Sequence, residues 1–324
     1  MNNLKIFGKF LDQPMLVAKF QKAIPAVLVA GGTAYTAYDA SKAKKGQRGK
    51  RVLKTGVTMG ATIASALAAP YIASKITKRP LPQNIQSIKT SNTQIIDSFI
   101  KSTKLSKDTK LILNKSKERI LSFKDVKTLF NNIGQSENGY KFLNKLIPEP
   151  QNVKAKDIFS EIGYLSVYGA IPVVGGIAGG TAADKITDKE HAKENFPNKV
   201  KEGLYQYLAN IFMCNVGAGI ALGILEKLGI TSKGARAAGM TAGIAATGII
   251  GGSKIANFID KKVISPIFKT KAAQKERTPE VLDIGLHTDD IATVSLLSGL
   301  KWIEPALPVM YSLSGYRAGI GYRN

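Results

Sequence analysis

AIPVVGGIAGGTAAD, residues 170–184, contains four glycines and carries no charge before its last residue. Two structures fit such a stretch: a glycine-rich loop that holds phosphate, or a helix smooth enough for another backbone to lie against it. A phosphate loop of the Walker type needs a lysine, then serine or threonine, after its last glycine. Here Gly180 is followed by Thr181, without a lysine. The sequence therefore favours a closely packed helix.

Five runs of at least 16 residues contain no Asp, Glu, Lys or Arg: residues 23–38, 55–74, 162–183, 203–225 and 237–253. A helix needs about 20 apolar residues, within a range of about 17–25, to cross the hydrocarbon core of a bilayer. Four runs reach that length, and the first is one residue short. We therefore expect the first run to enter the membrane and return as half of a hairpin. The helices of a large soluble core are the alternative, but they normally carry a charged face.

The G-x-x-x-G spacing recurs in these runs and places two glycines on one helix face, where a second helix can approach closely in lipid. Inside a soluble helix each glycine costs about 1 kcal/mol relative to alanine. The 31 glycines therefore favour the membrane. The expected helix-packing residues are Gly56, Gly60, Gly175, Gly176, Gly179, Gly180, Gly219, Gly223, Gly239, Gly243, Gly248 and Gly252. We expect them to pack a bundle and a homo-oligomer.

Residues 77–158 differ, because Lys, Asn, Ser and acidic residues recur among apolar residues at helical spacing, such as Val126, Leu129, Phe130 and Ile133. The expected fold class is all-α: a multi-pass helical membrane protein with Gly/Ala-rich, glycine-zipper-like helices and a small soluble helical insertion. The expected domains are an amphipathic N-terminal helix (1–22), a membrane helical hairpin (23–76), the soluble basic helical domain (77–158), a three-helix membrane region (159–262), a basic linker (263–290) and a C-terminal short-helix region (291–324). The N-terminal helix lies either on a membrane or on the protein's own core.

The net charge of +23 predicts an anionic partner. Nucleic-acid binders interleave aromatic and basic residues, whereas aromatic residues are only 7% of this chain, so we expect membrane lipids instead. Residues 39–54 carry seven basic residues against Asp39, a net charge of +6. Contacts with anionic lipid are expected from Lys42, Lys44, Lys45, Arg48, Lys50, Arg51 and Lys54. Short basic loops stay in the cytoplasm, where we therefore expect residues 39–54.

Few residues suggest catalysis. His287, Asp289 and Asp290 could bind a divalent cation or act as acid and base near a lipid headgroup, although the favoured explanation is capping of a helix that starts near Ile291. The single cysteine, Cys214, excludes an internal disulfide. We expect no metal and no cofactor. The uncharged runs contain no ionisable Asp, Glu, Lys or Arg, which argues against an ion-coupled transporter.

Residues 56–76 and 239–259 match at six positions without a gap, through duplication or through convergence of helices built from few residue types. The first function that we expect is non-enzymatic: an integral membrane scaffold or membrane-organising protein that oligomerises through small-residue faces. The second is a channel or facilitator-type transporter with a partial repeat. The third is a lipid-active enzyme that uses the histidine and the two aspartates near residue 290.

Overall fold

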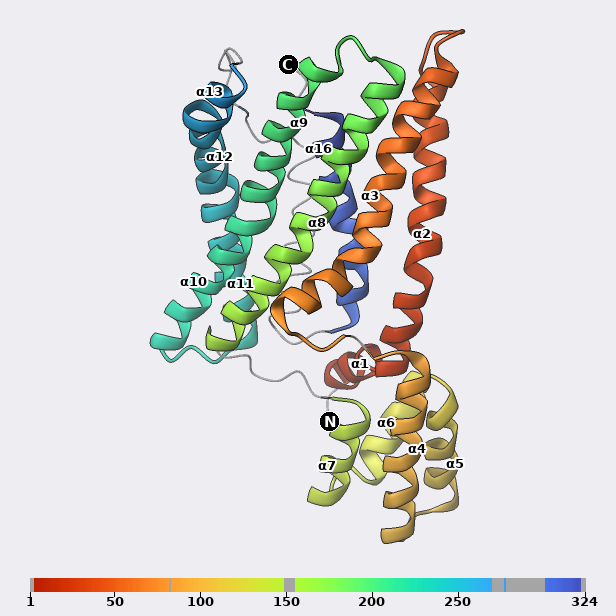
Figure 1. The fold of residues 1–324 in the computed structure, drawn as a ribbon. Helices are drawn as coiled ribbons and strands as arrows, with labels where there is room; N and C mark the ends of the chain where they lie inside the picture. Colours follow the sequence, from red (N-terminus) through yellow and green to blue (C-terminus); the bar gives the residue numbers. More distant parts are fainter. Residues whose placement is uncertain (1–2, 82, 149–154, 270–276, 278–300, 322–324) are drawn as a thin grey trace. The chain divides into compact units, whose positions relative to one another are not determined.

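Figure 1 shows the fold in a computed structural model, which describes residues 3–81, 83–148, 155–269, 277 and 301–321. Every secondary-structure element in these residues is a helix. The chain forms two compact units. The first unit comprises Met1–Ala23, Pro82–Asn152 and Ser298–Pro305, and the second comprises Ile24–Leu81, Val153–Leu297 and Ala306–Asn324.

The first unit is a cluster of short helices around an apolar core. Its elements are α1 (Asn3–Leu11), the first residues of α2 (Pro14–Ser41), α4 (Ile85–Ser102), α5 (Lys107–Glu118), α6 (Phe123–Asn132) and α7 (Glu137–Leu146). The side chains of Asn84, Ser106, Ser122 and Ser136 cap the first turns of α4 to α7. Such caps satisfy backbone N–H groups that have no partner inside the helix. The core includes Ile96, Leu113, Leu129, Phe130 and Leu143.

The N-terminal segment belongs to this core. Ile6 is fully buried in it, and Phe10 packs against it. The side-chain amide of Gln13, just after α1, donates to the carbonyl oxygens of Phe10 and Leu121. A new helix then starts at Pro14, a residue favoured in a first helical turn. Of the two places expected for this segment, the structure shows the protein's own core, and the single helix expected over 1–22 is instead two helices.

The start of α6 combines a capping box with an ion pair. The Ser122 hydroxyl accepts from the Asp125 N–H, and the Asp125 carboxylate accepts from the Ser122 N–H. Lys115 Nζ lies 2.6 Å from the same carboxylate. Burial raises the pKa of the Asp125 carboxyl, but the bonds from Lys115 and Ser122 outweigh burial and hold that pKa below its ordinary value of 3.8. Asp125 therefore stabilises the fold above its ordinary pKa, and this contribution is lost as the pH falls through the lowered value.

We expect Asp125→Asn to lower the free energy of opening of α6 by about 1 kcal/mol at neutral pH, as loss of a helix cap does. The difference from the wild type should shrink at pH 3, below the ordinary pKa of 3.8, where the contribution of the carboxylate is being lost. Hydrogen exchange of α6 peptides in the full chain measures both values. Glu137→Gln, which removes an exposed ion pair with Lys141 in α7, is the control and should change little. A difference of the same size at both pH values would contradict the expectation.

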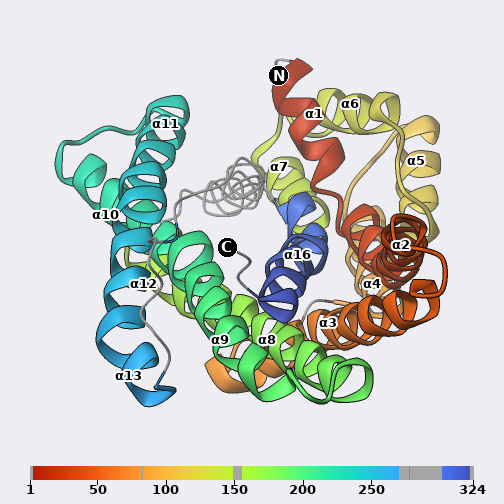
Figure 2. The same ribbon diagram turned by 90° about the horizontal axis from the view of Figure 1, so that it is seen from above.

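The second unit is built from long helices. It starts with the rest of α2, α3 (Arg48–Thr77) and α8 (Ala155–Thr187). Two continuous helices follow: the first consists of α9 (Ala192–Tyr207), η1 (Leu208–Phe212) and α10 (Met213–Lys227), and the second of α11 (Lys233–Ile244), η2 (Ala245–Gly252), α12 (Ser253–Ile259), η3 (Asp260–Ile264) and α13 (Ser265–Ile267). The last elements are η4 (Lys301–Ala306), which starts in the first unit, and α16 (Leu307–Ile320). The segments η1 to η3 are π-helical. Figure 2 shows how α8 is flanked by α3 and α9, and α8 also contacts α16.

Among the residues that the structure describes, five helices are long and apolar enough to cross a membrane, as judged by length and composition: Pro14–Ser41, Arg48–Thr77, Phe159–Thr187, Ala192–Lys227 and Gly234–Ile267. They support a multi-pass membrane protein. The first of them is longer than the uncharged run over 23–38 that we expected to enter the membrane and return. Its helix has 28 residues, because it continues through Lys19 and Lys22 back to Pro14.

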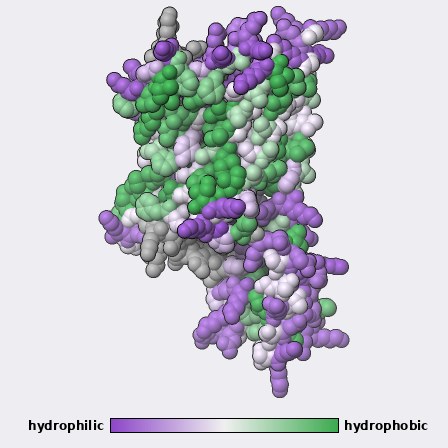
Figure 3. Space-filling model, in the orientation of Figure 1, coloured by the Kyte–Doolittle hydropathy of each residue, from purple (hydrophilic) through white to green (hydrophobic). Residues whose placement is uncertain are grey.

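The surface of the second unit is also typical of a membrane protein. Hydrophobic side chains cover the middle of the face seen in Figure 3, and hydrophilic ones gather at the end that holds the α2–α3 turn. Large apolar side chains that are more than half exposed include Val27, Val29, Val174, Ile186, Ile250 and Phe258. Soluble monomers rarely expose so many, whereas lipid covers them in a bilayer.

The two segments that match in sequence, 56–76 and 239–259, adopt different backbone structures. Residues 56–76 lie within the α-helix α3, whereas residues 239–259 include the π-helix η2. A π-helix of this length is rare, and π-helical turns often occur at functional sites.

Candidate functional site

The stretch 170–184 forms the second half of α8, and one of its small faces lies against α3. A Cβ atom on Gly175 would lie 2.0 Å from the Ser65 hydroxyl oxygen, and one on Gly179 would lie 2.4 Å from the Ala61 Cβ atom. Such distances leave no room for a side chain. This part of α8 is therefore a helix packed closely on its neighbour, not a loop.

The adjacent face of α8 lies against α16, where backbone meets backbone. A Cβ atom on Gly176 would lie 1.8 Å from the Gly315 carbonyl oxygen, and one on Gly180 would lie 1.9 Å from the Gly319 carbonyl oxygen. Both pairs advance by four residues, so the two helices stay in register over one turn. Carbonyl and Cα–H groups then approach closely enough for weak hydrogen bonds.

The other expected packing glycines divide into two groups. Cβ atoms on Gly239, Gly243, Gly248 and Gly252 would clash with residues of η1 and α10, and Gly219 is buried in α10 while Gly223 is half-buried. In α3, by contrast, nothing lies within 4 Å of a Cβ atom on Gly60, and the nearest atom to one on Gly56 is 3.9 Å away. The contacts seen all lie within one chain, so they bear on the bundle and not on an oligomer.

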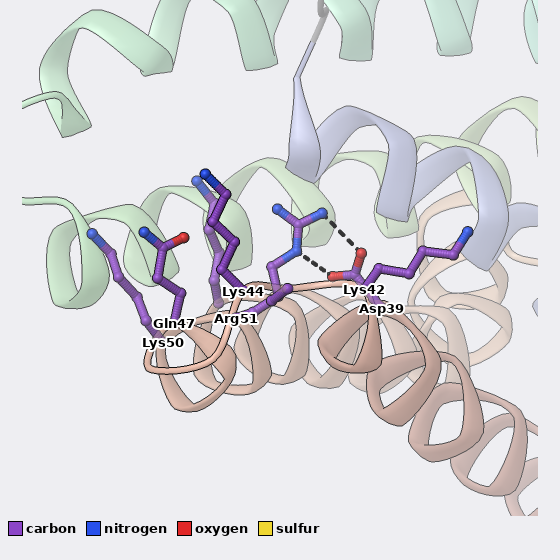
Figure 4. A pocket seen from close by; sticks show the side chains of 8 residues that line it. Asp39, Lys42, Lys44, Gln47, Lys50 and Arg51 are labelled. Carbon is purple, nitrogen blue, oxygen red and sulfur yellow. Dashed lines mark hydrogen bonds and ion pairs between the residues drawn. The ribbon is translucent and has the colours of Figure 1, made fainter.

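A basic pocket of about 480 Å³ lies at the α2–α3 turn. It is lined by Asp39, Lys42, Ala43, Lys44, Gln47, Lys50, Arg51 and Lys54. Five of the seven residues expected to contact lipid are in this set, and Lys45 and Arg48 are not. Figure 4 shows the labelled side chains projecting to the same side of the hairpin.

The backbone adds to the positive potential of this turn. Gly46 takes a left-handed conformation (φ 90°), which lets the chain reverse sharply before α3. Gln47 precedes α3 without forming a side-chain cap, and the first turn of α3 contains no acidic residue. The first N–H groups of α3 therefore have no side-chain cap, and the positive end of the helix dipole faces the turn.

Some of the lining charges are compensated inside the protein. Arg51 forms a bidentate pair with Asp39, with distances of 2.7 and 2.8 Å, and Thr55 donates to the same carboxylate. Lys42 lies 4.2 Å from the centre of the Tyr38 ring, and its hydrogen bond to Tyr38 raises the pKa of the ammonium, which stays charged.

Lys44 and Lys50 are different. In the part of the chain that the structure describes, no carboxylate lies within ion-pair distance of either ammonium group. Together with Lys42 they give the pocket an excess of positive charge. The pocket is therefore suited to hold an anionic group.

Beneath the pocket, a buried ion network begins at Asp184. This carboxylate is fully buried, with Lys54 Nζ at 2.6 Å and Lys199 Nζ at 2.5 Å. The three residues belong to α3, α8 and α9, so one carboxylate joins three helices. Lys199 is buried as well, with only 3% of its side chain exposed.

The network continues along α9 at Glu202. Its carboxylate lies 3.2 Å from Arg277 and 3.5 Å from Arg317 of α16, and it accepts a hydrogen bond from Gln206. Asn210 then donates to Gln206. Residues 199, 202, 206 and 210 advance by three or four, so they follow one buried face of α9 and η1. Each carboxylate in this network pairs with two cations.

The sequence interpretation missed this network. Asp184 lies one residue beyond an uncharged run, and Lys199 and Glu202 lie just before the next one. The uncharged runs are shorter than the helices that contain them, because α8 continues past Asp184 and α9 begins before Lys199. The spacing of 199, 202, 206 and 210 was the available signal. Ionisable side chains therefore lie within these helices, although the uncharged runs contain none.

The expected catalytic candidates, His287, Asp289 and Asp290, lie outside the described residues. Within the described ranges no group of three or more His, Cys, Asp and Glu side chains could hold a metal ion. His191 pairs with the Asp188 carboxylate at 2.9 Å in an exposed turn. Cys214 is fully buried, and its thiol donates to the Ala209 carbonyl oxygen.

The chain was also compared with known proteins. No protein-family model, curated protein or solved structure matches it.

Proposed function

We propose that the protein is a non-enzymatic integral membrane protein that binds anionic lipid headgroups at its α2–α3 turn and organises lipids around its helices. The basic pocket carries this proposal, because among the described residues no carboxylate lies within ion-pair distance of Lys42, Lys44 or Lys50, and the pocket lies at the end of two candidate membrane spans. Each lysine near an anionic surface contributes about 1 kcal/mol of attraction. The pocket thus concentrates at one point the positive charge that a scattered basic surface would distribute.

The proposal places the α2–α3 turn on the cytoplasmic side. Short loops rich in lysine and arginine stay there, and residues 39–54 carry a net charge of +6, from seven basic residues and Asp39. Anionic lipids are enriched in the cytoplasmic leaflet, so orientation and ligand agree.

The test replaces the three lysines together, as Lys42→Gln, Lys44→Gln and Lys50→Gln. At about 1 kcal/mol each, we expect the affinity for phosphatidylglycerol to fall by about a hundredfold, while phosphatidylcholine binding stays unchanged. Native mass spectrometry of the full chain in detergent, titrated with each lipid, measures both. The control replaces Lys110, Lys124 and Lys127, which are exposed on the first unit, with the same change of charge. Equal losses in both triple variants, or none in either, would contradict the proposal.

The proposed homo-oligomer needs glycine faces that remain free. Gly176 and Gly180 pack against α16 within the chain, whereas Gly31 and Gly60 face open space on α2 and α3. We therefore assign the glycine-zipper-like contact between copies to the outer side of the α2–α3 hairpin.

A channel or facilitator is the second candidate. The buried face of Lys199, Glu202, Gln206 and Asn210 favours it, because buried polar groups within membrane helices often line ion or solute paths. Each of the two carboxylates, Asp184 and Glu202, pairs with two cations, so the network has excess positive charge and would favour the passage of an anion. Reconstituted vesicles that release neither chloride nor phosphate would count against this function.

A further inference from the structure

A shallow apolar groove of about 340 Å³ runs along α8 beside α9. It is lined by Val174, Ala178 and Ala182 of α8 and by Phe196 of α9, and Lys185 is the one charged residue of the lining. The first three of these residues are exposed and advance by four, so they share one helix face. This face is distinct from the two glycine faces of α8, which α3 and α16 cover.

The groove owes its shape to small and large side chains. Alanine at 178 and 182 leaves a hollow along two turns of α8. Phe196 rises beside it, held by an edge-on contact with the Phe268 ring, with the ring centres 5.6 Å apart. The groove is therefore formed by side chains of α8 and α9.

The length of the groove corresponds to one leaflet of a bilayer. From Val174 to Lys185 the helix rises by about 16 Å, at about 1.5 Å per residue. Half of a hydrocarbon core of about 30 Å is nearly the same length. Lys185 lies two residues before the end of α8, where headgroups would lie.

The charge of Lys185 is available to a ligand. No carboxylate among the described residues lies within ion-pair distance of it. The ion pair of Asp184 with Lys54 places this end of α8 beside the start of α3. The charged end of the groove therefore lies at the same membrane surface as the basic pocket.

We infer that this groove binds one acyl chain of an anionic phospholipid, whose phosphate is held by Lys185. The inference rests on the proposed binding of anionic lipids but concerns a second place. Apolar burial gives affinity for any chain of sufficient length, and Lys185 selects an anionic headgroup. Lys and Arg side chains at helix ends commonly reach the headgroup region in this way.

Two variants of the full chain test it. Ala182→Phe fills the hollow, and we expect it to weaken the tightest phosphatidylglycerol and phosphatidylcholine binding alike, by about tenfold, which is the loss of about 1.4 kcal/mol. Lys185→Gln should weaken phosphatidylglycerol alone by about fivefold. Native mass spectrometry of the detergent-solubilised protein, with these two lipids as probes, resolves the effects. Ile186→Phe, an exposed change one residue outside the groove, is the control.

Folding is checked by the buried Cys214 thiol, which should stay unreactive in all three variants. Unchanged lipid binding by Ala182→Phe, or an equal loss in Ile186→Phe, would overturn the inference. The lysine triple variant of the α2–α3 turn separates the two proposals. If it loses phosphatidylglycerol and Ala182→Phe loses nothing, the groove fails and the proposed function stands. If only Ala182→Phe shows a loss, the groove stands and the proposed pocket fails.

Discussion

Gly176→Leu is expected to force α8 and α16 apart and to destabilise the second unit strongly. The first added carbon would lie 1.8 Å from the Gly315 carbonyl oxygen, and backbone, unlike the end of a side chain, cannot turn aside. Overpacking costs about 1–3 kcal/mol when side chains can adjust, so we expect at least the upper value here. The measurement is thermal unfolding in detergent, followed by reaction of Cys214 with a fluorogenic maleimide. Cys214 is fully buried, so it reacts only when the bundle opens.

Gly60→Leu is the matched control, because open space lies beside Gly60 at the same kind of G-x-x-x-G position. We expect it to leave the unfolding temperature of Cys214 nearly unchanged. Its effect should instead appear in the oligomeric state on a native gel, where the proposed contact between copies lies. If Gly176→Leu changed only the oligomeric state and left Cys214 protected, the close contact would lie between chains.

The glycine pattern shows what a sequence can and cannot predict. Spacing by four identifies a helix face without side chains, because it follows from helix geometry. It does not identify the partner. Gly60 and Gly176 look alike in sequence, yet one faces open space and the other faces α16, about 140 residues farther along the chain. Partners at such separation are set by the tertiary fold.

Apolar periodicity performs better in the first unit. Val126, Leu129, Phe130 and Ile133 were expected on one helix face, and all four lie in its core, which confirms that pattern. Leu111 belongs to a similar apolar run but is 70% exposed. The consecutive apolar residues Leu111, Ile112 and Leu113 cannot all face the core from one helix, and the tertiary fold determines which of them faces solvent.

Charges at helix ends are the opposite case. The sequence interpretation treated each charged residue as the edge of a membrane segment, because an isolated charge is costly in an apolar environment. Asp184 is nevertheless fully buried, since Lys54 and Lys199 approach it from two other helices. Whether a charge can be buried thus depends on its partners, and these partners are distant in the sequence, so a local sequence pattern does not reveal them.

Asp184→Asn is expected to produce the second large effect. It leaves two ammonium groups, one of them almost wholly buried on Lys199, without their shared carboxylate. Removing one partner of a buried ion pair typically costs about 3–5 kcal/mol, because the remaining charge is neither solvated nor paired. We expect a fall of several degrees in the temperature at which Cys214 becomes reactive. Glu190→Gln, which removes an exposed carboxylate near the same end of the bundle, should leave it unchanged.

A second substitution separates the loss of a bond from the burial of a lone charge. Lys199→Met alone should destabilise the protein less, because Asp184 keeps Lys54 at 2.6 Å. In the double variant Asp184→Asn/Lys199→Met the unpaired buried ammonium is gone, so the protein should recover part of its unfolding temperature relative to Asp184→Asn. A double variant less stable than Asp184→Asn would show that Lys199 stabilises the bundle by packing alone. In that case the carboxylate would not be what joins α3, α8 and α9.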